Sequence, residues 1–191
     1  MVFEILLDYS ANSKVLEWML DKKLSMEKLY ASAQKRIYDF LFKYTRNPDT
    51  AMDLTQDTFL SFFKTYSDQN LTEEKSIMLL YTIARNRSIN FSKKFSTMKE
   101  NSSLNEDIHS KSVSFEKKLE WQDLENKLWK CMDELNEDER CIIELRHIQD
   151  YNLTQISEIM GISVSTASRM VVKATSNLLK LAESKNINLE S

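Results

Sequence analysis

The sequence contains very little glycine and proline. Its 191 residues include one of each, Gly161 and Pro48, far below average usage. Tight turns between β-strands need residues that tolerate a positive φ, chiefly glycine, so this composition argues against a β-rich fold. Leu, Met, Glu and Lys are abundant instead, and apolar residues recur at helical spacing. The composition predicts an all-α protein.

Cysteine and histidine are also scarce. Cys131 and Cys141 form no CxxC pair and have no histidine pair nearby, so neither a disulfide scaffold nor a zinc site is supported. We expect two reduced, mostly buried thiols. His109 and His147 have no partner that suggests catalysis, and the chain has no glycine-rich phosphate loop or nucleophile motif. We therefore expect no enzyme activity, no metal and no cofactor.

Long apolar runs are missing as well. No segment approaches the roughly 20 apolar residues that a membrane span needs. The apolar start of the chain lacks the basic residues of a signal peptide, and Glu4 and Asp8 interrupt it. The sequence predicts a cytoplasmic protein whose chain is not inserted in a membrane.

The net charge of −3 conceals a segregation of charge along the chain. Residues 76–99 contain five basic residues and no acid, and residues 161–182 contain three basic residues and no acid. Between them, residues 100–139 contain 12 acidic and 5 basic residues, a net charge of −7. Local basic faces attract phosphates more than the total charge does, although charge runs are often only solvated surface.

Three helices are predicted before the acidic stretch. The first covers residues 26–44, and the second begins at Asn47-Pro48, with Asn as N-cap, and runs to about residue 66. A polar loop at 67–75 precedes the third helix at 76–94. Their predicted buried stripes are Leu29, Ile37, Phe40, Leu41 and Tyr44; Met52, Phe59, Phe62, Phe63 and Tyr66; and Ile77, Leu80, Tyr81, Ala84, Ser88, Phe91 and Phe95. The first 25 residues could form a short helix, and we assign them no role.

Four more helices are predicted after a polar linker at 96–116. The first runs over 117–135, and a second opens at Asn136 with a capping-box pattern and holds Ile142, Leu145 and Ile148 inside. A third is capped by Thr154. After the turn at Gly161, Ser163 caps a fourth whose buried stripe is Val164, Ala167, Val171, Ala174 and Leu178. The last two predicted helices form a helix-turn-helix.

These elements define the expected organisation of the chain as two small helical domains joined by a flexible polar linker. The predicted bounds are 1–25 for an N-terminal extension, 26–95 for the first domain, 96–116 for the linker, 117–185 for the helix-turn-helix domain and 186–191 for a tail.

Three motifs in this order resemble bacterial sigma factors of the small extracytoplasmic-function type, which have only regions two and four. The motifs are AMDLTQDTF at 51–59, LLYTIARNRSINFSKK at 79–94 and TQISEIMGISVSTASRMVVKA at 154–174. The resemblance covers about residues 26–181. It implies a protein that binds core RNA polymerase and directs promoter-specific initiation by recognising the −10 and −35 elements.

The first motif is similar to the region-two pattern A-E-D-L-x-Q-E-x-F, with Asp57 in place of Glu. Helical geometry independently places Asp53 and Asp57 on an outward face. The resemblance implies that this face docks on a basic coiled coil of the polymerase clamp, where carboxylates can pair with arginines. The implied polymerase-binding residues are Asp53, Leu54, Gln56 and Asp57.

The second motif is similar to the family's −10 reader, W-L-x-x-I-A-R-N-x-x-I-D, with Leu79 for Trp and Asn90 for Asp. The loop at 67–75 would hold a base flipped from the melted strand. The implied −10 contacts are Thr82, Arg85, Asn86, Arg87, Asn90, Lys93 and Lys94, although for Arg85 a helix-flank salt bridge or a clamp contact is nearly as well supported.

The third motif is similar to region four, in which the first turns of the recognition helix reach base edges in the major groove. The family's G-T-V-K-S-R aligns with residues 165–170, and Arg169 is the basic residue that remains there. The implied −35 contacts are Thr154, Gln155, Ser165, Thr166, Ser168 and Arg169, with Lys173 on phosphate.

The resemblance also implies partners, namely the clamp coiled coil and flap of core RNA polymerase, promoter DNA and an anti-sigma factor. Two other functions remain open from the residues alone. One is a helix-turn-helix regulator that binds DNA without polymerase, and the other is a module that sequesters polymerase or another regulator.

Overall fold

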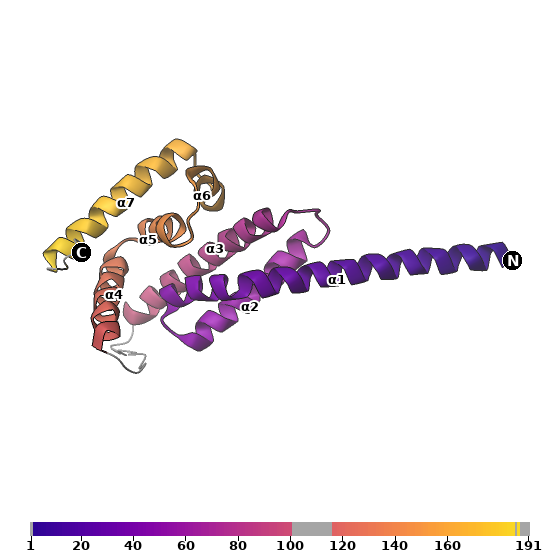
Figure 1. Ribbon diagram of the computed structural model, residues 1–191, viewed down its shortest axis with the longest axis horizontal. Helices are drawn as coiled ribbons and strands as arrows, with labels where there is room; N and C mark the ends of the chain where they lie inside the picture. Colours follow the sequence, from indigo (N-terminus) through magenta and orange to yellow (C-terminus); the bar gives the residue numbers. More distant parts are fainter. Residues whose placement is uncertain (1, 101–115, 186, 188–191) are drawn as a thin grey trace. The chain divides into compact units, whose positions relative to one another are not determined.

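The computed structural model describes the backbone of residues 2–100, 116–185 and 187, and the side chains of 20, 22–93, 124, 126–185 and 187. Every regular element within these ranges is helical, as the composition predicts. The chain divides into two compact units, residues 1–92 and 93–191. Figure 1 shows the helices of each unit.

The N-terminal unit is built from α1 (Val2–Thr45), α2 (Pro48–Tyr66) and the start of α3 (Glu73–Glu100). α1 is one continuous helix of 44 residues, so the first 25 residues are not a separate short helix. No glycine or proline interrupts this stretch, and nothing else in the sequence stops a helix before Thr45. The helix therefore starts well before the predicted residue 26.

Aromatic and aliphatic side chains from all three helices form the core of this unit. The predicted buried stripe of α1 is confirmed. That of α3 is confirmed except at Phe91, which is half-buried, and Phe95 lies outside the described side chains. The ring of Phe40 meets the ring of Tyr81 edge to face, with centroids 5.4 Å apart. Tyr30 and Phe59 make a similar contact at 4.8 Å. Such pairs add to the stabilisation that burial provides.

The predicted buried stripe of α2 is wrong at Met52, whose side chain is 38% exposed. Thr55 and Thr58 are fully buried instead. Their hydroxyls donate to the carbonyls of Ala51 and Leu54, both at 2.7 Å, so no polar group is left unsatisfied and the methyl groups can pack. Periodicity gives the direction of a side chain, but it does not say how far the neighbouring helix reaches.

The N-terminus of α2 is capped as predicted, whereas α3 begins earlier than predicted. Asn47 is the N-cap of α2, and its Oδ1 accepts from the backbone N–H of Thr50 at 2.9 Å, as predicted. The loop after α2 is shorter than the predicted 67–75, because α3 already begins at Glu73. Glu73 and Glu74 occupy the first turn of α3, where carboxylates interact favourably with the helix dipole. α3 continues to Glu100, so the predicted helix end at 94 is wrong and residues 96–100 of the predicted linker are helical. Residues 101–115 of that linker lie outside the described residues.

The C-terminal unit consists of α4 (Glu116–Glu134), α5 (Glu137–Ile143), the π-helical turn η1 (Glu144–Ile148), α6 (Leu153–Met160) and α7 (Val164–Ser184). Ile142, Leu145 and Ile156 are fully buried, as predicted. Ile148 and Val164 were predicted to be buried but are 47% and 44% exposed. Both lie at the end of an element, where side chains of the same helical stripe extend past the neighbouring helices.

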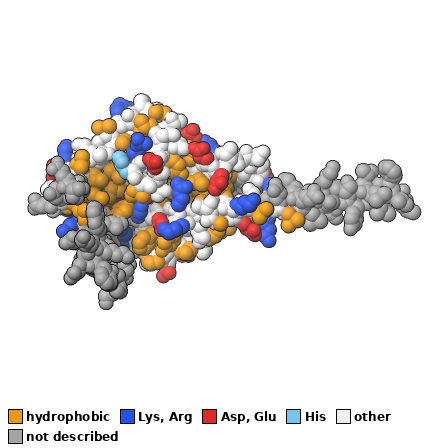
Figure 2. All heavy atoms as spheres, in the orientation of Figure 1, with side chains coloured by type: hydrophobic (Ala, Val, Ile, Leu, Met, Phe, Trp, Pro, Cys, Tyr) orange, Lys and Arg blue, Asp and Glu red, His pale blue; other side chains and the backbone are white. Residues whose placement is uncertain are grey.

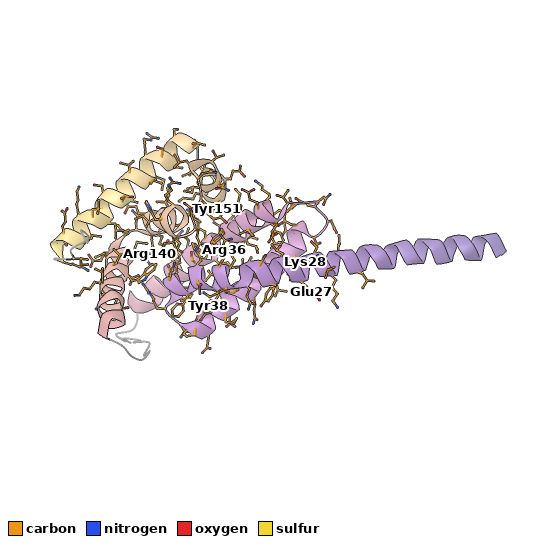
Figure 3. The ribbon with its side chains drawn as sticks, viewed as in Figure 1. Glu27, Lys28, Arg36, Tyr38, Arg140 and Tyr151 are labelled. Atoms are coloured by element: carbon orange, nitrogen blue, oxygen red, sulfur yellow. The ribbon has the colours of Figure 1, made fainter. Side chains whose placement is uncertain are left out.

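The side chain of Arg140 on α5, labelled in Figure 3, forms hydrogen bonds to the end of α4. Its Nε donates to the carbonyl of Met132 at 3.0 Å, and its Nη2 donates to the carbonyl of Asp133 at 2.9 Å. These carbonyls belong to the last turn of α4, where the regular helical donors run out; that of Met132 also accepts from the backbone N–H of Leu135 at 3.2 Å. One guanidinium therefore completes the C-terminus of the preceding helix.

Both cysteines are free and buried, as predicted. Cys131 packs with Ala182 and with Ile187, which lies beyond the end of α7. In the part of the chain that the structure describes, no cluster of His, Cys, Asp and Glu could hold a metal ion. Within the same residues, no helix combines the length and the apolarity needed to cross a membrane.

Candidate polymerase-binding and DNA-binding surfaces

The outer side of α2 carries three exposed polar side chains, Asp53, Gln56 and Asp57, which we call the docking face. They lie on one side of the helix because residues three and four apart are neighbours on a helix surface. Leu54 is only half-buried, and Leu60 continues the docking face with a side chain that is 54% exposed. The sequence-predicted polymerase-binding residues thus form one accessible surface.

Asp57 is held by Arg87 of α3. The Nη1 of Arg87 donates to Oδ2 of Asp57 at 3.0 Å, and its Nη2 donates to the backbone carbonyl of Asp57 at 3.0 Å. Nη2 also donates to the hydroxyl of Ser61 at 2.5 Å. Arg87 was predicted to contact DNA, whereas the structure places its guanidinium against α2.

The other predicted −10 residues on α3 fall into two groups. Asn86, Asn90 and Lys93 are exposed together on the outward side of the helix. Thr82 and Arg85 are only half-buried, and the Thr82 hydroxyl donates to the carbonyl of Met78 at 3.1 Å. The side chain of Lys94 lies outside the described residues.

The loop between α2 and α3 has a contact that the sequence did not reveal. Lys22 of α1 donates a hydrogen bond to the carboxylate of Asp68. This hydrogen bond and the positive charge of Lys22 hold the pKa of Asp68 below its ordinary value. The two residues are 46 positions apart, so no local pattern could pair them.

The helix-turn-helix is formed by α6, the turn at Gly161 and α7. Gly161 ends α6 with φ of +67°, in the left-handed region that suits glycine. Ser163 then caps α7, and its Oγ accepts from the backbone N–H of Thr166 at 3.1 Å. Ser165 and Arg169 are exposed on the first two turns of α7, and Thr166 and Ser168 are half-buried beside them.

The start of α6 differs from the prediction. Its N-cap is Asn152 rather than Thr154, and Asn152 forms a reciprocal capping box with Gln155. The backbone N–H of Gln155 donates to Asn152 Oδ1 at 3.0 Å, and the backbone N–H of Asn152 donates to Gln155 Oε1 at 2.9 Å. Asn152 is the better cap because this pair satisfies two helix-end donors at once. Thr154 remains exposed, while the Gln155 side chain is already hydrogen-bonded.

Lys173 lies further along α7 and faces a buried carboxylate. Its Nζ is 3.2 Å from Oε1 of Glu139, whose side chain is 8% exposed. At the start of α5 the sequence predicts a capping box between Asn136 and Glu139. The structure shows one half of it: the side chain of Asn136 accepts from the backbone N–H of Glu139. A shallow, open part of the surface on α7 is formed by Ser168, Arg169, Val172, Lys173, Ser176, Asn177 and Lys180.

Charges of both signs are mixed on one face of the described residues. On the face shown in Figure 2, Lys and Arg side chains are interspersed with Asp and Glu. Weak single-sign fields give little long-range attraction for DNA. The described residues in this view therefore present no broad basic patch.

Comparison with known proteins identifies both units. The family model for Sigma-70 region 2 matches residues 29–96, and the model for Sigma-70, region 4, matches residues 131–180. The chain is 27% identical over 163 residues to RNA polymerase sigma factor YlaC of Bacillus subtilis (strain 168), covering 82% of this chain and 91% of that protein.

A solved structure shares the fold. It is the sigma factor RpoE in complex with the anti-sigma factor NepR from Bartonella quintana, with a TM-score of 0.65 and 19% sequence identity. The likeness covers 83% of this chain and 97% of that chain. The two region matches together span more than half of the sequence, in the order that the three motifs predict. This chain belongs to the sigma-70 family, as an extracytoplasmic-function sigma factor that directs transcription initiation.

Proposed function

We propose that this sigma factor binds core RNA polymerase through the docking face of α2, reads the −10 element with α3 and the loop before it, and reads the −35 element with α7. The functional domains follow the bounds 26–95 and 117–185, with 96–116 as the connection between them. The observation that carries the proposal is the joint exposure of Asp53, Gln56 and Asp57 on one side of α2.

The docking face is chemically suited to a basic partner. Two carboxylates one turn apart can accept hydrogen bonds from arginines of the clamp coiled coil, and charge-assisted bonds of this kind are directional. Leu60 adds an exposed apolar side chain beside them, and covering it with a partner would remove apolar surface from water. The flap of the polymerase is the expected second contact, with the C-terminal unit.

The DNA-reading residues differ between the two elements. On α3, Asn86, Asn90 and Lys93 are exposed together, so their side chains can reach bases and phosphates. On α7, Arg169 has the donor geometry for a bidentate contact with guanine, which contributes about 1–3 kcal/mol of discrimination. Ser165, Thr166 and Ser168 lie around it, and Lys173 is the proposed phosphate contact.

An anti-sigma factor is a further proposed partner. It would cover the docking face or the DNA-reading surfaces, and thereby keep the protein from polymerase until it is released. All of these partners meet the protein in the compartment that holds the chromosome.

The test is binding and run-off transcription with bacterial core RNA polymerase. We expect Asp53→Ala/Gln56→Ala/Asp57→Ala to lose core binding and transcription while its circular dichroism stays unchanged. A charge-matched control, Glu27→Ala/Glu183→Ala, removes two exposed carboxylates elsewhere and should bind as the native protein does. Equal binding by the two variants would contradict the proposed docking face.

DNA reading is tested in the assembled holoenzyme. Arg169→Ala should lower transcription from a promoter with its −35 element and have less effect on one that depends on the −10 element alone. Full activity of Arg169→Ala at both promoters would contradict the assignment. Tight, palindromic DNA binding in the absence of polymerase would instead support a self-sufficient regulator, which the region-two match does not favour.

A further inference from the structure

Arg87 and Asp57 connect the helix proposed to read DNA with the helix proposed to bind polymerase. Arg87 belongs to α3, one position after Asn86, and Asp57 belongs to the docking face of α2. The Arg87 side chain is 28% exposed and that of Asp57 is 56% exposed. The arginine thus lies largely covered at the junction of the two helices, while the carboxylate remains accessible to a partner.

The guanidinium is fixed at three points. Besides Oδ2 of Asp57, it contacts the backbone carbonyl of Asp57 and the hydroxyl of Ser61. Two of these acceptors do not depend on the carboxylate, so Arg87 keeps its place even if the Asp57 side chain turns. A planar guanidinium with several fixed donors then holds the carboxylate in one orientation.

We propose that Arg87 is a positioning residue for polymerase binding, which orients the Asp57 carboxylate toward the clamp rather than contacting DNA itself. This inference rests on the proposed docking face. A carboxylate has two oxygens that can each accept hydrogen bonds, and Arg87 contacts only Oδ2. Oδ1 is therefore available to an arginine of the partner. An arginine that served to mask Asp57 would be expected to engage both oxygens.

The direction in which Arg87→Ala changes the affinity for polymerase distinguishes a positioning role from a purely electrostatic one. The partner of the docking face is basic, so removing a positive charge near it should by itself strengthen binding. Positioning predicts the opposite for Arg87→Ala, because Asp57 must then be ordered at the moment of binding. Ordering one side chain costs enough to weaken binding about three- to tenfold.

The experiment measures the dissociation constant for core RNA polymerase by competition against a fluorescent native sigma factor. The variants are Arg87→Ala, Asp57→Ala and the double variant, with Lys64→Ala as the control for loss of one exposed positive charge on α2. We expect Arg87→Ala to weaken binding, Lys64→Ala to leave it unchanged or strengthen it, and the double variant to bind no worse than Asp57→Ala. Contacting residues are expected to be non-additive in this way.

A second variant guards against a folding artefact. Ser61→Ala removes one anchor of Arg87 without touching either charge, and it should weaken binding in the same direction by a smaller factor. Circular dichroism and urea unfolding verify that each variant is folded.

Three results would overturn the inference. Native affinity for Arg87→Ala would show that Asp57 needs no positioning, and tighter binding would indicate masking. If the affinity losses of the two single variants added up in the double variant, and promoter binding fell at saturating polymerase, Arg87 would be a DNA contact instead. If the native protein itself did not bind core polymerase, the proposed function would fail together with the inference, and that outcome is distinct from the other three.

Discussion

The carboxylate of Glu139 on α5 accepts a hydrogen bond from the side-chain amide of Asn177 on α7 at 2.9 Å. The same oxygen, Oε1, lies 3.2 Å from Lys173 Nζ. Glu139 is thus a buried acceptor with two donors from the recognition helix, and it fixes where the middle of α7 lies on α5. Buried polar groups with satisfied partners specify one packing arrangement.

Removal of this acceptor should loosen α7. Glu139→Ala leaves the amide of Asn177 without its partner at a part-buried site, which costs about 1–3 kcal/mol. Hydrogen exchange of the amides in α5 and α7 would measure the loss. Glu137→Ala, in the same first turn of α5, is the control and should have a much smaller effect. Equal protection in the two variants would contradict a structural role for the Glu139–Asn177 pair.

The capping box of α6 makes a second, paired prediction. Asn152→Ala removes the side chain that caps the helix, and N-cap losses of this kind cost about 1 kcal/mol. Thr154→Ala removes an exposed side chain that caps nothing and should be nearly neutral for stability. Urea unfolding of both variants checks the difference. A larger loss in Thr154→Ala would mean that the helix starts at Thr154 instead.

Replacement of Asp150 by glycine should increase the stability of the fold. The Asp150 φ of +57° lies in the left-handed region, which costs most side chains roughly 1–2 kcal/mol and aspartate less. Glycine removes this strain but gains freedom in the unfolded chain, so Asp150→Gly should stabilise by up to about 1 kcal/mol. The control is Glu158→Gly within α6, which should destabilise by about 1 kcal/mol. Thermal unfolding of the two variants should therefore shift in opposite directions.

The Lys22–Asp68 contact predicts a pH effect. Because the folded pKa of Asp68 is lowered below its ordinary value of 3.8, this contact stabilises the fold above that pH and is lost as the pH falls through the lower folded value. Lys22→Met should return the pKa of Asp68 toward 3.8. A titration of the Asp68 carboxyl by NMR in both proteins measures the change, and identical titrations would show that Lys22 does not bind the loop in solution.

The sequence predicted the helices and most of the core well, because apolar periodicity reports directly on which side of a helix is buried. Ile37 and Tyr81 are examples of residues predicted to be buried and found to be so. The outward direction of Asp53 and Asp57 could be predicted in the same way. The capping box of Asn152 and Gln155 also had a visible signal, since an Asn is followed three residues later by a Gln.

The remaining features depend on tertiary contacts. Arg87 is one residue from Asn86, a rotation of about 100° on the helix, and only the position of α2 decides which of them meets solvent. The pairs Arg87–Asp57 and Lys22–Asp68 join residues 30 and 46 positions apart. Nothing local in a sequence encodes such pairs.

The burial of both cysteines provides an internal probe of one unit only. Cys131 is fully buried against Ala182 and Ile187, and Cys141 is 1% exposed in α5. A thiol reagent can reach either sulfur only when the surrounding helices open, so its rate of reaction reports local opening. Since the N-terminal unit contains no cysteine, the reaction does not report on opening of that unit. The native protein can therefore show, without any label, whether DNA or polymerase closes the helix-turn-helix unit.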